Sequence, residues 1–147
     1  MIAIADGGAT KCDWALVENG EIVERVKMAG INPFSVPEEQ IRSVVKEEFM
    51  PVASRYDITH IWFYGAGCGM AGETVKRVLA DHFPAAEIVV GSDIDGAAMA
   101  CCGSGSGVVC ILGTGVSSMQ VENGVCVKRL PGPGYILGDE GSGTVMG

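Results

Sequence analysis

The sequence predicts an α/β fold in which a hairpin unit with a glycine turn occurs twice. Apolar segments with strand periodicity and helix periodicity alternate over the first part of the chain. Glycine accounts for 22 of the 147 residues, about twice its average share, and it clusters at the ends of apolar runs. The pattern of the opening hairpin returns near residue 108.

The chain opens with three expected strands. Residues 1–5 form an apolar run that ends at Asp6-Gly7-Gly8, as expected of a strand that enters a glycine turn. Residues 12–18 and 21–29 flank Asn19-Gly20, the dipeptide most typical of a two-residue hairpin. We therefore expect three antiparallel strands joined by two tight turns.

Helices and strands then alternate. Residues 37–49 have apolar side chains near helical spacing, with Ser35 as a candidate N-cap. Residues 60–64 are rich in strand-forming residues and end in a glycine loop at 65–69. A helix is expected at 72–83, a strand at 87–90 and a helix of small residues at 94–102.

A repeat shows where a second domain is expected to begin. At a constant offset of 104 residues, seven residues of the opening hairpin recur without a gap. They are Thr10, Val17, Glu18, Asn19, Gly20, Val23 and Arg25, which return as Thr114, Val121, Glu122, Asn123, Gly124, Val127 and Arg129. A glycine and serine linker at 103–107 precedes the second copy. We predict a first domain at 1–105 and the start of a second, incomplete domain at 106–147.

Charge and composition exclude several classes of protein. The net charge of −8 argues against a nucleic-acid surface, which needs clustered Lys and Arg. The six cysteines form no C-x-x-C pair and only two His residues are present, so a zinc or iron–sulfur site is poorly supported. No apolar run is long enough to span a membrane, and the first is interrupted by Asp6, too early for a secretory leader. We expect a cytoplasmic protein with reduced thiols.

The two glycine turns suit a polyphosphate. Glycine lets backbone N–H groups converge on an anion without a Cβ in the way, and a Thr hydroxyl adds a donor. The first turn also has a carboxylate at the strand end and a Lys, the groups needed to hold Mg²⁺ and neutralise a triphosphate. Predicted phosphate-binding residues are Asp6, Gly7, Gly8, Thr10 and Lys11 in the first turn and Gly113, Thr114 and Gly115 in the second, with Asp6 at the metal.

Four motifs, taken in order, resemble a known family. They are Asp6-Gly7-Gly8-x-Thr10-Lys11, Ser92-Asp93, Gly113-Thr114-Gly115 and Gly138-Asp139-Glu140-Gly141-Ser142. Together they resemble the N-acetylglucosamine kinase branch of the BadF/BadG/BcrA/BcrD ATPase family, within the actin–hexokinase–Hsp70 superfamily. The resemblance implies a ribonuclease-H-like, actin-like ATPase domain with a mixed five-stranded sheet, followed by the first strands of a second such domain. ATP and substrate would bind in the cleft between the two.

The resemblance also assigns a catalytic base. Asp93 takes the place of the carboxylate that accepts the proton of a sugar hydroxyl during phosphoryl transfer. It follows an apolar strand, and the carboxyl ends of strands are where ligands bind in α/β sheets. The alternatives are that Asp93 only caps the next helix, or that Asp95 is the base.

Three further residues are implied to contact the sugar. Asn32 lies in a segment similar to the family's Gly-x-Asn, although Asn before Pro33 is also a common turn. Asp139 and Glu140 resemble an acidic pair that accepts hydrogen bonds from sugar hydroxyls, although they also fit a surface turn. Cys68, in the glycine loop, is expected to be an inert wall residue.

The chain departs from the family pattern in three respects. Val116 follows Gly-Thr-Gly where Ser is usual, and Cys12 stands where Thr is common. The family's adenosine-binding segment would lie beyond Gly147. We therefore expect a fragment with negligible kinase activity by itself, and we consider a homodimer formed through the uncovered second sheet.

Three functions of different class remain open. The first is an ATP-dependent sugar kinase that acts on an amino sugar such as N-acetylglucosamine. The second is an ATPase activator of a 2-hydroxyacyl-CoA dehydratase or benzoyl-CoA reductase, which would hold an iron–sulfur cluster through cysteines at a dimer interface. The third is a non-catalytic nucleotide or sugar sensor. The expected partner is a small sugar, with no nucleic acid and no membrane.

Overall fold

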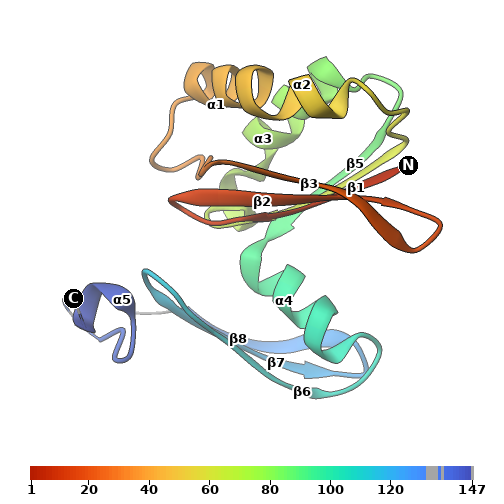
Figure 1. Ribbon diagram of the computed structural model, residues 1–147. Helices are drawn as coiled ribbons and strands as arrows, with labels where there is room; N and C mark the ends of the chain where they lie inside the picture. The colour runs from red at the N-terminus through yellow and green to blue at the C-terminus, as the bar shows by residue number, and fades with distance from the viewer. Residues whose placement is uncertain (132–135, 137, 147) are drawn as a thin grey trace. The chain divides into compact units, whose positions relative to one another are not determined.

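The computed structural model describes residues 1–131, 136 and 138–146, which form two compact units, Met1–Asp93 and Ile94–Gly147. The elements of the first unit are β1 (Ile2–Gly7), β2 (Lys11–Glu18), β3 (Glu21–Ala29), α1 (Glu38–Val44), the π-helix η1 (Val45–Phe49), α2 (Met50–Ala53), β4 (His60–Gly65), α3 (Cys68–His82) and β5 (Glu87–Ser92) (Figure 1). Those of the second are α4 (Asp93–Cys102), β6 (Gly107–Leu112), β7 (Val116–Glu122), β8 (Val125–Pro131) and α5 (Gly143–Met146). In the described part of the chain, no helix is both long and apolar enough to cross a membrane.

The first unit contains the predicted mixed five-stranded sheet, in the order β3-β2-β1-β4-β5. The strands β1, β2 and β3 pair antiparallel, whereas β1, β4 and β5 pair in parallel. Gly7 pairs with Gly65, and Gly65 pairs with Ser92, so three parallel strands end at the same level. The fold prediction is confirmed, and the sheet edge where ligands are expected is defined.

One face of this sheet is covered by α1, η1, α2 and α3 (Figure 1). Alternate residues of the strands point to this face and are buried, as the period of two requires. Trp14 of β2 stacks on Phe49 of η1 with ring centroids 4.0 Å apart. The predicted helix at 37–49 continues to Ala53, because Pro51 lies in the first turn of α2, where its missing N–H costs little.

The helix α3 begins four residues before its predicted start at residue 72. Its N-cap, Gly67, has a left-handed backbone (φ 79°), and Ala71 is non-helical (φ −117°, ψ 17°) inside the helix. The first turn is therefore set at an angle to the rest, which conceals the helical periodicity of Cys68–Ala71 in the sequence.

The sheet of the second unit reproduces the hairpin β2–β3. In both copies the register shifts at the same point, between Leu16 and Val17 and between Gln120 and Val121. Asn19 and Asn123 both have φ of 52°. The pairs Leu112↔Val116 and Gly7↔Cys12 close turns of different length, so the second glycine turn is one residue shorter. The offset of 104 therefore holds from the turn onward but not before it.

The core of the second unit lies between α4 and the sheet β6-β7-β8. Ile94 and Ala98 of α4 pack against Val109, Met119 and Val121. The compact unit therefore includes α4, whereas the boundary predicted at 105–106 placed this helix in the first domain. The assignment of complete domains stays a prediction.

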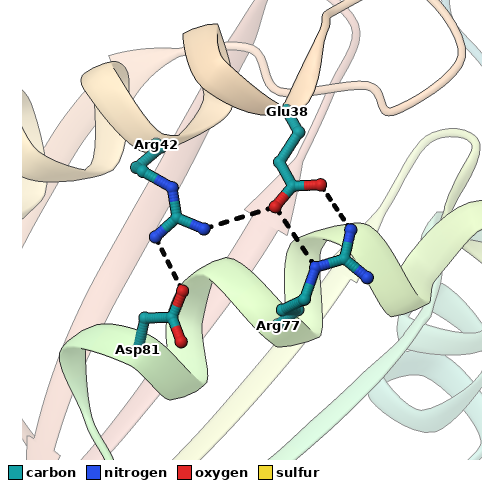
Figure 2. Close-up of polar contacts among 4 residues, drawn as sticks. All are labelled: Glu38, Arg42, Arg77 and Asp81. Carbon is teal, nitrogen blue, oxygen red and sulfur yellow. Dashed lines mark hydrogen bonds and ion pairs between the residues drawn. The ribbon is translucent and has the colours of Figure 1, made fainter.

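An ion-pair network joins α1 to α3 on the surface of the first unit (Figure 2). Glu38 accepts hydrogen bonds from Arg77 and Arg42, and Arg42 also donates to Asp81 at 2.7 Å. The hydrogen bond from Arg77, followed by the charges of Arg77 and Arg42, holds the pKa of Glu38 below its usual range. Glu38 is hydrogen-bonded to both arginines.

We predict that Glu38→Gln lowers the melting temperature at neutral pH. A depressed pKa means that the carboxylate stabilises the fold above its unfolded-state pKa and that this contribution is lost as pH falls through the folded-state pKa. The difference between wild type and variant, followed by circular dichroism, should therefore shrink from pH 7 toward pH 3 and in high salt. The control Glu39→Gln changes an exposed neighbour on the same helix. Equal effects of the two changes would contradict a specific role for Glu38.

Candidate functional site

The site is built on the carboxyl ends of β1, β4 and β5. Asp6 is exposed near the end of β1, and Asp93 is half-buried immediately after β5. Two strand spacings separate β1 from β5, so these ends lie about 10 Å apart. Both predicted carboxylates therefore belong to one edge of one sheet within the first unit.

The first glycine turn is closed by short backbone contacts. The N–H of Gly8 donates to the carbonyl of Lys11 at 2.8 Å, and the N–H of Gly30 donates to the carbonyl of Thr10 at 3.1 Å. A Cβ on Gly30 would lie 2.4 Å from the carbonyl oxygen of Ala9. Only glycine at position 30 lets the end of β3 support the turn. Thr10 and Lys11 remain exposed at its tip, as a phosphate-binding role requires.

A second carboxylate faces Asp6 across the hairpin. Asp13 on β2 pairs directly with Asp6 on β1, and Lys11 Nζ donates to Asp13 Oδ2 at 2.9 Å. This hydrogen bond is the main cause that raises the pKa of Lys11 and lowers that of Asp13, so both stay charged at neutral pH. Asp6 and Asp13 also line a hollow of about 380 Å³ in the first unit, together with Arg25 and Lys27.

Asp13 is a site residue that the sequence analysis missed. The available signal was alternation, because residues 11 and 13 of a strand point to the same face. The described residues contain no cluster of three or more His, Cys, Asp and Glu side chains able to hold a metal. Mg²⁺ commonly uses only one or two carboxylates together with the phosphates of its nucleotide. The Asp6–Asp13 pair fits that kind of site.

The Asn32 turn meets the glycine loop that follows β4. Asn32 Oδ1 accepts the N–H of Phe34 at 2.9 Å, and the carbonyl of Asn32 accepts the N–H of Val36 at 2.9 Å. A Cβ on Gly67 would lie 2.3 Å from Asn32 Oδ1. The N–H of Ala66 donates to the carbonyl of Gly7 at 2.7 Å, which ties this loop to β1.

The raised pKa of the Cys68 thiol indicates where Asp93 lies. The thiol is buried, and burial is the main cause that raises its pKa to about 11, with the nearby charge of Asp93 as the second cause. Asp93 is thus close enough to the loop of Gly67 and Cys68 for its charge to act there. The rival base, Asp95, is ion-paired with Arg129 of β8. In the first unit, the predicted residues Asp6, Thr10, Lys11, Asn32 and Asp93 all lie at this end of the sheet.

We predict that Cys68 reacts slowly with iodoacetamide and faster after Asp93→Asn. With a pKa of about 11, about 1% of the thiol is ionised at pH 9. Removal of the neighbouring charge lowers this pKa and should raise the rate at pH 9 about two- to fivefold. Mass spectrometry of the Cys68 peptide measures the rate, and Asp95→Asn is the control. An unchanged rate in Asp93→Asn would contradict the placement of this carboxylate near Cys68.

The second unit contains the other glycine turn and the acidic pair. The N–H of Gly113 donates to the carbonyl of Gly115 at 3.0 Å, which closes the turn between β6 and β7. A Cβ on Gly115 would lie 3.3 Å from Asp139 Oδ2. Asp139 is buried and has a left-handed backbone (φ 65°), whereas Glu140 is exposed. Asp139 therefore lies against the turn, and Glu140 does not share its burial.

The segment that follows the acidic pair stabilises this turn through hydrogen bonds. The N–H of Gly143 donates to the carbonyl of Gly113 at 2.7 Å, and Thr144 Oγ1 donates to the carbonyl of Thr114 at 2.6 Å. Ser142 is fully buried, and its Oγ accepts the N–H of Val145. The sequence analysis missed the contribution of Thr144. It stays a prediction that Gly113–Gly115 and the first turn bind one polyphosphate together. The effect of Val116, where the family has Ser, also stays a prediction.

Comparison with known proteins identifies the family. The model of the BadF/BadG/BcrA/BcrD ATPase family matches residues 5–147. The chain belongs to this family. A search of the curated proteins gives no match. The BadF/BadG match covers every motif on which the resemblance rested.

Solved structures agree with membership of the BadF/BadG/BcrA/BcrD family. A candidate N-acetylglucosamine kinase from Porphyromonas gingivalis is 38% identical with a TM-score of 0.95, over 100% of this chain and 53% of that one. A candidate N-acetylglucosamine kinase from Chromobacterium violaceum is 19% identical (TM-score 0.64; 97% and 52% covered). A ROK family glucokinase from Streptomyces griseus, solved with glucose and AMPPNP, is 17% identical (TM-score 0.61; 89% and 47% covered). The last two show the fold alone. The chain spans about half the length of these structures.

Proposed function

We propose that this chain supplies the phosphate-binding and base-bearing part of an ATP-dependent sugar kinase. The observation that carries the proposal is the common position of the Asp6–Lys11 turn and Asp93 at one edge of one sheet. Membership of an ATPase family supports the use of ATP. The similarity to a candidate N-acetylglucosamine kinase supports an amino sugar as the acceptor.

The first turn is proposed to bind the β- and γ-phosphates of ATP. Its exposed tip offers backbone N–H groups and the hydroxyl of Thr10. The missing side chain of Gly7 makes room for the ring of Phe63, which would lie 2.7 Å from a Cβ at that position. Asp6, with Asp13 opposite, would hold Mg²⁺, which neutralises phosphate charge when bound. Lys11 stays charged through its pair with Asp13 and adds a positive charge beside the phosphates.

Asp93 is proposed as the general base. Its carboxylate accepts the proton of a sugar hydroxyl while that oxygen attacks the γ-phosphorus and ADP leaves. Asn32, near Gly67, would bind the sugar from the same end of the sheet. In the second unit, Asp139 and Glu140 would accept hydrogen bonds from sugar hydroxyls. The position of Asp139 against Gly115 also brings a carboxylate beside the second phosphate turn.

The proposal is tested by measuring release of ADP with a panel of hexoses and amino sugars. The protein would be this chain extended through the second half of the family fold, with the 147-residue chain as the comparison. We expect turnover with N-acetylglucosamine only in the extended protein, because the adenosine-binding segment is proposed to lie in that half. Turnover by the 147-residue chain would contradict the expectation of an inactive fragment. If the extended protein releases no ADP with any of the sugars, the proposed sugar-kinase function is contradicted.

Two further expectations remain proposals. Val108, Leu112 and Leu130 are 73%, 65% and 55% exposed on β6 and β8, and pairing of two chains through these strands would cover such surface. Light scattering tests this homodimer, and a monomeric mass would remove it. We also propose the cytoplasm as the compartment, in keeping with six free thiols.

A further inference from the structure

We propose that Asn19 is a site of spontaneous deamidation and isomerisation, whereas Asn123 is protected from the same reaction by the contacts of its turn. Asparagine followed by glycine is especially prone to this modification, because glycine has no side chain to hinder its backbone nitrogen. The chain contains two such dipeptides, Asn19-Gly20 in the first unit and Asn123-Gly124 in the second.

The reaction needs only the chain and water. The backbone nitrogen of Gly20 loses its proton and attacks Cγ of Asn19. A bond forms between this nitrogen and Cγ, the bond from Cγ to Nδ2 breaks, and the amide group leaves as ammonia with the proton. Water then opens the cyclic imide at one or the other carbonyl carbon, which gives aspartate or isoaspartate. The rate therefore depends on how freely the glycine nitrogen can lose its proton and reach Cγ.

The two sites are matched in local sequence and in backbone conformation. Both belong to the sequence Val-Glu-Asn-Gly, at 17–20 and at 121–124. Asn19 and Asn123 both have φ of 52°, and the glycines that follow them have φ of 82° and 75°. A difference in reactivity between the folded turns is therefore expected to come from the contacts that each turn makes.

The second turn is held by the loop between α4 and β6. The N–H of Gly124 donates to the carbonyl of Gly105 at 2.8 Å, and the N–H of Asn123 donates to Ser106 Oγ at 3.0 Å. A Cβ on Gly124 would lie 3.0 Å from the carbonyl oxygen of Gly103. The nitrogen that must lose its proton is thus engaged as a donor and packed against backbone atoms. Reaction at Asn123 requires this contact to open first.

The first turn has no such cover. Within the described part of the chain, the Gly20 N–H makes no hydrogen bond, and no heavy atom lies within 4 Å of a Cβ at this position. Asn19 is exposed between Glu18 and Glu21, which already pair across the hairpin. The reaction would add a third carboxylate to this turn, and like charges at opposed positions destabilise a strand pair. The product should therefore loosen this end of the hairpin.

The test follows both sites during one incubation of the folded protein at mildly alkaline pH. Peptide mass spectrometry measures the deamidated product at each site, with Asn19→Asp and Asn123→Asp proteins as references. We expect Asn19 to react about three- to tenfold faster than Asn123, the factor expected when one hydrogen bond must open first. Equal rates, or a faster reaction at Asn123, would overturn the inference.

Two controls separate the effect of the fold from that of the local sequence. In guanidinium chloride the contacts of both turns are lost, so the rates should converge. If they still differ by the factor seen in the folded protein, the difference comes from Glu21 and Val125, which follow the glycines, and the inference is wrong. Ser106→Ala removes the acceptor of the Asn123 N–H and should speed the reaction at Asn123 without changing Asn19. An unchanged rate at Asn123 in this variant would contradict protection by the loop.

Discussion

Asp93→Asn should lower kcat about 10²- to 10⁴-fold in the chain extended to the full family fold, the usual contribution of a general base. Asparagine keeps the size of the side chain but cannot accept the proton of the sugar hydroxyl. The dissociation constants of ATP and sugar should change less than threefold, because the proposed role of the carboxylate lies in the transition state (about 0.6 kcal/mol or less). Single-turnover rates and calorimetric binding separate the two effects.

Asp95→Asn is the matched control for this prediction. Asp95 lies two residues further along, but its carboxylate is ion-paired with Arg129 and is not available as a base. The kcat of the Asp95→Asn variant should therefore stay within about threefold of the wild-type value. A large loss in Asp95→Asn with an active Asp93→Asn would exchange the two roles. If both variants keep the wild-type turnover, general-base catalysis by this segment is contradicted and a non-catalytic sensor is favoured.

Gly30→Ala should displace the first glycine turn and destabilise the protein. The added Cβ would lie 2.4 Å from the oxygen and 2.5 Å from the carbon of the Ala9 carbonyl, and 2.7 Å from the oxygen of Gly8. These are backbone atoms of the turn itself, so relief of the clash must displace it. We expect a loss of about 2–4 kcal/mol in the free energy of unfolding, measured by urea denaturation. Affinity for ATP should fall about tenfold or more, since the phosphate donors move.

Gly113→Ala provides the control at the other glycine turn. Among the described residues, no heavy atom lies within 4 Å of a Cβ at this position. The free energy of unfolding should therefore change by about 0.5 kcal/mol or less. If Gly30→Ala is as mild as Gly113→Ala, the close support of the first turn by the end of β3 is wrong.

The regular part of the fold could be predicted from the sequence because its signals are local. Asn19-Gly20 and Asn123-Gly124 predict hairpins through the left-handed backbone that both turns adopt. The strands at 60–64 and 87–90 follow from β-branched and aromatic residues, and the structure extends each by one or two residues to Gly65 and Ser92. The repeat of the sequence is matched in the structure by a register shift at the same place in both hairpins, at Val17 and Val121.

Features that depend on tertiary contacts could not be predicted in this way. The π-helix at Val45–Phe49 exists where Phe49 stacks on Trp14, a residue thirty-five positions earlier. The start of α3 depends on the left-handed backbone of Gly67, which rests against Asn32. Neither contact leaves a periodic signal in the local sequence.

The sequence predicted the residue types of the site more completely than it predicted their arrangement in space. The sequence singled out Asp6 but not Asp13, because the significance of Asp13 comes from its cross-strand pairing. It assigned Asp139 to the sugar from motif order alone, whereas the structure also places this carboxylate against Gly115. Thr144 was missed since its role is a hydrogen bond to a turn thirty residues earlier.

The most direct test is a crystal structure of the chain with ADP, Mg²⁺ and N-acetylglucosamine. The account predicts nucleotide phosphates within hydrogen-bonding distance of both Thr10 and Thr114, with Mg²⁺ on the side of Asp6. A sugar hydroxyl should lie next to Asp93. Phosphates bound to one turn alone, or a sugar remote from Asp93, would contradict it.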